Sequence, residues 1–99
     1  MRPETSVENY LHRQVAKAGG GHRRVAWVGR RNAPDDLIAI PGLFPFFVEC
    51  KAPGEKPRLG QLREHERLRT MGFKVFVIST CEEADRLLAE VTGANHDAL

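Results

Sequence analysis

The sequence of 99 residues predicts an α/β fold, a mixed β-sheet flanked by helices with the element order α-β-β-β-α-β-α. Three observations lead to this prediction. Apolar residues recur at helical spacing near both ends of the chain, short β-prone runs lie between them, and a third helical segment separates the last two of these runs. A strand–helix–strand connection favours a parallel pair, here beside an antiparallel hairpin. We expect one domain over residues 1–99, with a flexible tail at 92–99.

The first helix and the first strand have clear local signals. Thr5 and Glu8 have the spacing of a capping box, so the helix is predicted to start at Thr5. Apolar residues then continue at helical spacing past Val15, and the glycines at 19–21 end the helix. The β-prone run 24–28 is predicted as the first strand, and an arginine-containing loop follows it.

The remaining elements follow in the same way. Strands at 37–40 and 46–51 are separated by a proline–glycine turn and should pair as a hairpin. Good helix formers fill 59–71, and a glycine follows where a C-terminal cap is expected. The run 74–78 is predicted as the fourth strand, and a second capping-box pattern opens a helix over 80–91.

Composition excludes several classes of protein. The formal net charge of +2 is too small for a histone-like polycation, although it allows a nucleic acid as partner. Two cysteines are too few for a disulfide framework, which favours a reducing compartment. The N-terminus lacks the apolar segment of a secretion signal, and no apolar run is long enough to span a membrane. We therefore expect a soluble cytoplasmic protein with no membrane partner.

One group of charged residues suggests chemistry. Side chains alternate along a strand, so Glu49 and Lys51 share one face of the third strand, and Asp35 lies just before its hairpin partner. Two carboxylates brought close together repel each other, and Mg²⁺ relieves that repulsion, with the Cys50 carbonyl as a possible third oxygen. Such an ion would activate water for phosphodiester hydrolysis, with Lys51 offsetting developing charge. The alternative is a solvated surface ion pair of little energetic value.

Longer patterns around these residues resemble a known family. They are Ala-Pro-Asp at 33–35, Phe-Val-Glu-Cys-Lys-Ala-Pro at 47–53, Gln61, and the helix end at 68–72. Together they resemble the VRR-NUC family, a branch of the PD-(D/E)xK nuclease superfamily, in its stand-alone phage or bacterial form. The resemblance spans roughly four-fifths of the chain. It implies a restriction-endonuclease-like fold.

The resemblance also implies an activity and a set of site residues. It predicts a Mg²⁺- or Mn²⁺-dependent DNA endonuclease that acts as a homodimer on branched DNA, such as four-way junctions. A capping box alone would also explain Glu8, and Cys50 and Asp36 depart from the commoner residues at their positions. The implied catalytic residues are Asp35, Glu49, Lys51 and Gln61, and the implied metal ligands are Glu8, Asp35, Glu49 and the backbone carbonyl of Cys50.

Arginine and lysine residues close to this group are the predicted DNA contacts. They are Arg30 and Arg31 in the loop before Asp35, and Lys56 and Arg58 in the loop after Lys51. Two other functions stay open. One is a flap or single-strand nuclease within a replication or repair complex, and the other is an inactive nucleic-acid-binding module.

Overall fold

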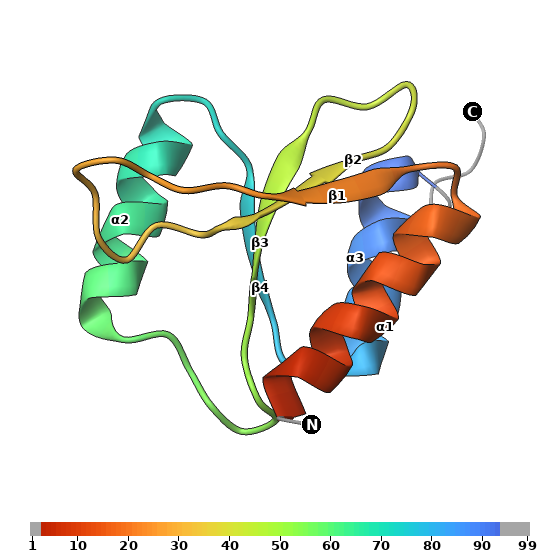
Figure 1. Cartoon of the computed structure of the whole chain (residues 1–99), viewed down its shortest axis with the longest axis horizontal. Helices are drawn as coiled ribbons and strands as arrows, with labels where there is room; N and C mark the ends of the chain where they lie inside the picture. Colours follow the sequence, from red (N-terminus) through yellow and green to blue (C-terminus); the bar gives the residue numbers. More distant parts are fainter. Residues whose placement is uncertain (1–2, 94–99) are drawn as a thin grey trace.

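The predicted order of elements is confirmed. A computed structural model describes residues 3–93, which form a four-stranded sheet and three helices (Figure 1). The elements are α1 (Pro3–Lys17), β1 (Gly21–Arg24), β2 (Asp36–Ala39), β3 (Phe46–Cys50), α2 (Leu59–Thr70), β4 (Val75–Ile78) and α3 (Cys81–Thr92).

The sheet has the predicted mixture of pairings. Its strand order is β1-β2-β3-β4. β1 pairs with β2, and β2 with β3, in antiparallel orientation, whereas β3 and β4 are parallel. The parallel pair follows from the crossover through α2, since a helix returns the chain to the same end of the sheet. β3 is therefore hydrogen-bonded on both sides.

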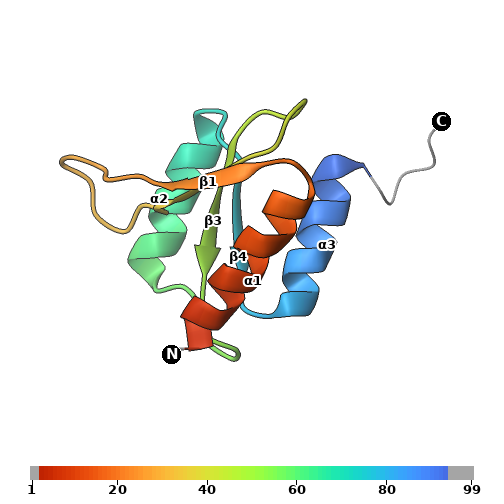
Figure 2. The same ribbon diagram turned by 45° about the vertical axis from the view of Figure 1, so that its right-hand side comes forward.

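Helices cover both faces of the sheet. α1 and α3 lie together on one face and α2 lies on the other (Figure 2). Alternation along β3 supplies both cores, because Phe46 and Val48 face α1 and α3 while Phe47 faces α2. The larger core includes Leu11 and Val15 of α1, both fully buried.

The first strand begins earlier than predicted. β1 is Gly21–Arg24 rather than 24–28, because Gly19 takes a left-handed conformation with φ 84° and the chain turns at once to pair with β2. Of the apolar residues that suggested a strand, Val25 and Trp27 instead pack in a loop against the smaller core, whereas Val28 is exposed. The indole N–H of Trp27 donates to the Pro34 carbonyl at 2.7 Å, and its ring contacts Phe47 with centroids 5.3 Å apart.

The capping box predicted at Thr5 is wrong. α1 already includes Pro3, a residue type favoured in the first helical turn, and the Glu8 carboxylate binds Arg24 at 3.2 Å. For the second capping pattern, the hydrogen bond of the hydroxyl residue is confirmed, since Thr80 Oγ1 accepts from the Glu83 N–H at 3.0 Å.

Residues 94–99 of the expected tail lie outside the described residues, and α3 continues to Thr92. Within residues 3–93, no helix has the length and apolar character needed to cross a membrane.

Candidate active site

The three predicted carboxylates line one cavity. It has a volume of about 250 Å³ and lies where α1, the start of β2 and the end of β3 meet. Helix, loop and strand each contribute one acidic side chain, from Glu8, Asp35 and Glu49 respectively. The lining residues are Thr5, Glu8, Arg24, Asp35, Val48, Glu49 and Cys50.

The register of the hairpin brings two of these carboxylates together. Asp36 pairs with Val48 and Leu37 with Phe47, so the same register continued by one residue places Asp35 opposite Glu49. Residues opposite each other on an antiparallel pair have side chains about 5 Å apart. Pro34 is fully buried and fixes the chain immediately before Asp35. The proline–aspartate pair thus anchors the acidic residue at the cavity while leaving it partly exposed.

A guanidinium group lies between two of the carboxylates. Arg24 of β1 donates to Asp35 Oδ2 at 2.9 Å and to both Glu8 carboxylate oxygens at 3.2 Å. The charge of Glu8, followed by the hydrogen bond to Asp35, raises the pKa of the Arg24 guanidinium above its ordinary value. The sequence analysis did not predict this role, because nothing local links Arg24 to a helix sixteen residues earlier. The site therefore already draws one cation to its acidic residues.

Glu49 and Lys51 form the predicted pair on one face of β3. Lys51 Nζ lies 3.5 Å from Glu49 Oε2, and both side chains are mostly buried. Gln61 of α2 donates from Nε2 to Glu49 Oε2 at 3.4 Å, while its Oε1 accepts from the Arg58 N–H at 2.9 Å. The start of α2 therefore holds Gln61 against Glu49, so a helix on the opposite face contacts one of the carboxylates that line the cavity.

A buried histidine was missed as a neighbour of this pair. His65 has no exposed surface, and its Nε2 lies 3.7 Å from Glu49 Oε1. Neither ring nitrogen has a hydrogen-bond partner among the described residues. The i,i+4 spacing from Gln61 was the available signal, since it places both side chains on one side of α2. The complete burial of His65 is typical of a histidine that packs in the core.

The side chains of the cavity fit a hard divalent cation. Glu8, Asp35 and Glu49 offer carboxylate oxygens, which Mg²⁺ and Mn²⁺ prefer as ligands. Burial raises the pKa of the Cys50 thiol, and sulfur is in any case a soft ligand that Mg²⁺ and Mn²⁺ do not prefer. Only the backbone carbonyl of Cys50 is then suited to a metal. Asp36 points under α1 towards His12 and does not line the cavity.

The predicted DNA contacts lie in three places, none of them in the lining of the carboxylate cavity. Arg30 and Arg31 line a hollow of about 420 Å³, where Arg30 pairs with the buried carboxylate of Glu64 at 2.7 Å. Lys56 lines a different hollow beside β4, and Arg58 is exposed at the start of α2. The Glu64 side chain is buried on α2, and its charge is compensated there by hydrogen bonds from Arg30 and Arg67.

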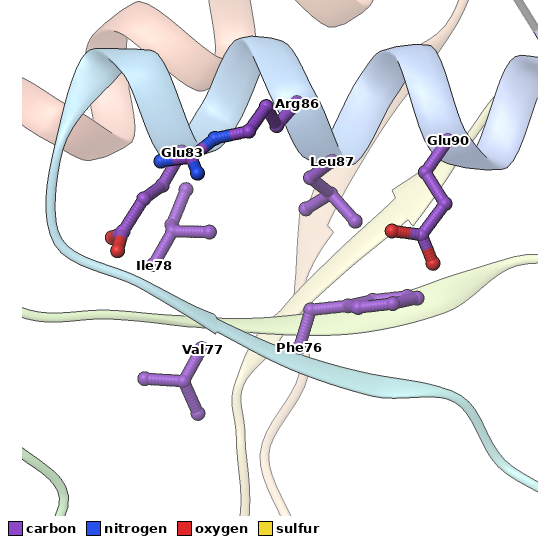
Figure 3. A pocket seen from close by; sticks show the side chains of 7 residues that line it. All are labelled: Phe76, Val77, Ile78, Glu83, Arg86, Leu87 and Glu90. Carbon is purple, nitrogen blue, oxygen red and sulfur yellow. The ribbon is translucent and has the colours of Figure 1, made fainter. Parts of the chain in front are cut away.

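A hollow between β4 and α3 offers no comparable chemistry. It has a volume of about 260 Å³, with Phe76 and Ile78 contributed by β4 and Leu87 by α3 (Figure 3). Its charged residues, Glu83, Arg86 and Glu90, all come from α3. None of the predicted site residues lines it. The carboxylate-lined cavity is therefore the candidate active site.

Comparison with known proteins identifies the family. No protein-family model matches the sequence. A phage protein named "Putative nuclease p44", from Acyrthosiphon pisum secondary endosymbiont phage 1, is 48% identical over 77 residues, covering 78% of this chain and 83% of the phage protein. A solved structure titled "VRR_NUC domain" aligns with a TM-score of 0.81 at 37% identity, covering 89% of this chain and 96% of that one.

This chain belongs to the VRR-NUC family. The resemblance noted in the sequence is thus confirmed, as is the mixed sheet flanked by helices. Both matches support a nuclease. In this VRR-NUC chain, the conserved architecture explains why the residues of the predicted motif meet at one end of β3, since the hairpin and the crossover helix both converge there.

Proposed function

We propose that this VRR-NUC chain is an endonuclease that hydrolyses DNA phosphodiester bonds with the help of Mg²⁺ or Mn²⁺. The main observation is the convergence of Glu8, Asp35 and Glu49 on one cavity, next to a lysine held by Glu49. Even with Arg24 and Lys51 beside them, the three carboxylates leave one negative charge uncompensated, and their mutual repulsion costs stability. Their proximity is explained if the cavity binds a cation during catalysis.

Each residue of the proposed site has a distinct role. Glu8, Asp35, Glu49 and the Cys50 carbonyl hold the metal, which when bound supplies activation of water and neutralisation of phosphate charge. Lys51 orients the attacking water or offsets charge developing on the phosphate. Gln61 is a predicted catalytic residue as well, and its hydrogen bond keeps one oxygen of Glu49 in place.

Branched DNA is the proposed substrate, and a homodimer the proposed form. A two-fold dimer presents two sites in opposite orientation, which suits paired nicks across a four-way junction. Arg30, Arg31, Lys56 and Arg58 are exposed on loops that flank the strands of the site, and we propose that they hold phosphates. A phage protein among the relatives is consistent with action in the cytoplasm of a bacterial cell.

The test is cleavage of labelled four-way junction, flap, single-stranded and duplex DNA with Mg²⁺, Mn²⁺ or EDTA. Asp35→Asn and Lys51→Ala should abolish cleavage while the circular dichroism spectrum stays unchanged. Glu55→Gln and Lys17→Ala are matched controls, because they remove similar charges on exposed residues away from the cavity. Light scattering then measures the oligomeric state.

The outcomes separate the alternatives. Preference for flaps or single strands would favour a nuclease of a replication or repair complex over a junction enzyme. DNA binding without cleavage under every metal would contradict the catalytic proposal and leave a binding module. Equal activity in the Asp35→Asn variant and the Glu55→Gln control would show that the carboxylate cavity is not the active site.

A further inference from the structure

A second group of side chains that can bind a metal lies on α1, β1 and β2, next to the carboxylate cavity. His12 of α1, His22 of β1 and Asp36 of β2 offer ligand atoms that all lie within 4.8 Å of one another. Within residues 3–93, no other three His, Cys, Asp or Glu side chains have ligand atoms this close together, so the carboxylates of the cavity would have to move towards one another to share an ion, whereas this group is already assembled. Three different elements therefore supply it, although their residues are far apart in the sequence.

The pairing of His12 with Asp36 accounts for only part of this group. The Asp36 carboxylate is almost fully buried, and His12 Nε2 lies 2.8 Å from Oδ2 and 3.0 Å from Oδ1. One histidine is enough to compensate a buried carboxylate. The His22 ring nevertheless stacks on His12, with centroids 3.4 Å apart and planes 6° apart. The stack keeps one ring nitrogen of each histidine within 4.8 Å of a carboxylate oxygen of Asp36.

We propose that His12, His22 and Asp36 form a binding site for one Zn²⁺ ion, separate from the metal site of the carboxylate cavity. Two imidazole nitrogens with one carboxylate oxygen are a common ligand set for zinc, and water completes the tetrahedron. Ligand distances of about 2.0–2.1 Å place the ligand atoms about 3.3 Å apart. The present separations require only a modest movement, in which the exposed His22 side chain turns out of its stack.

A zinc ion at this site would link α1 to the sheet. His12 is one helical turn after Glu8, and Asp36 directly follows Asp35. A zinc ion that joins His12 to Asp36 would therefore fix the backbone that carries two of the cavity's carboxylates. The carboxylates face the cavity while Asp36 points under α1, so the two sites would share the same elements without sharing a side chain.

The experiment is a titration of the chelator-treated protein with Zn²⁺ by calorimetry, and with Co²⁺ by visible absorption. With excess Mg²⁺ present to occupy the carboxylate cavity, we expect one Zn²⁺ or Co²⁺ ion per chain, with the absorption of four-coordinate Co²⁺. His22→Ala should weaken binding at least about tenfold, and His22→Asn should behave similarly. His96→Ala is the matched control, because it removes another histidine, one outside the described residues. Asp35→Asn should keep full zinc affinity.

Thermal unfolding provides an independent measurement. Zn²⁺ at a hundred times its Kd should raise Tm by roughly 10–20 °C in the unmodified chain, and much less in His22→Ala. Equal affinity in the His22→Ala and His96→Ala variants would overturn the proposal. Loss of binding in Asp35→Asn would overturn it too, because the ion would then occupy the carboxylate cavity. Absence of DNA cleavage would leave these binding results unaffected, so failure of the proposed nuclease activity is distinguishable from failure of the zinc site.

Discussion

Replacement of Arg24 tests the cavity most directly. Its guanidinium lies between Glu8 and Asp35, with nitrogen–oxygen distances of 3.2 and 2.9 Å. A metal ion bound by both carboxylates must displace this group or share them with it. In the Arg24→Ala variant the carboxylates lose their internal cation and keep their mutual repulsion. We therefore expect Arg24→Ala to bind Mn²⁺ more tightly than the unmodified chain.

The size of the effect follows from the exposure of the ion pairs. The Arg24 side chain is 61% exposed, and its partners Glu8 and Asp35 are 20% and 52% exposed. Exposed pairs contribute about 0.2–1 kcal/mol each, so the two together contribute roughly 0.4–2 kcal/mol. Removal of this competition corresponds to a gain in Mn²⁺ affinity of about 2- to 30-fold. High salt should shrink the gain, because it screens exposed charges.

The assay is calorimetric titration of Mn²⁺ into the two proteins at low ionic strength. Arg23→Ala is the matched control, because Arg23 is the neighbouring residue on β1 and its side chain donates to the His22 carbonyl at 2.7 Å. Both substitutions change the net charge equally, so only the local contact differs. Equal or weaker Mn²⁺ binding in Arg24→Ala than in Arg23→Ala would refute the idea that Arg24 competes with a metal.

Three further substitutions test the core, a buried carboxylate and the site. Leu11→Ala should lower the free energy of unfolding in urea by about 2.7–5 kcal/mol, because Leu11 is fully buried, and a loss below 1 kcal/mol would contradict that packing. Hydrogen bonds from Arg30 and Arg67 lower the pKa of Glu64 in the folded protein. The ion pairs therefore stabilise the fold at pH values above the ordinary glutamate pKa of about 4.3, and this contribution is lost as the pH falls through the lowered pKa of the folded protein. Arg30→Ala should flatten the acid side of the Tm–pH curve, and an unchanged curve would show that the pair is not formed. Gln61→Ala should slow cleavage by about 10- to 100-fold with the fold retained, and unaltered kinetics would exclude a role in holding Glu49.

The sequence by itself determined the order of the elements and the faces of β3. Helical and strand spacing are local properties, so α1, α2, α3 and the hairpin were predictable from apolar periodicity and turn residues. Alternation with a period of two placed Glu49 and Lys51 on one side, and the structure has them 3.5 Å apart. Asp35 was placed beside them because a hairpin with a short turn has few possible registers.

Only the tertiary structure decided which partners these residues meet. Arg24 reaches Glu8, and His22 stacks on His12, because α1 packs along β1 and against the start of β2 at a particular rotation. Periodicity predicts which face a side chain occupies but gives no information on the element packed against it. The burial of Glu64 likewise depends on a loop arginine 34 residues away. Such contacts depend on how whole helices and strands pack against one another. This packing is determined by burial of the two cores, and no local stretch of sequence encodes it.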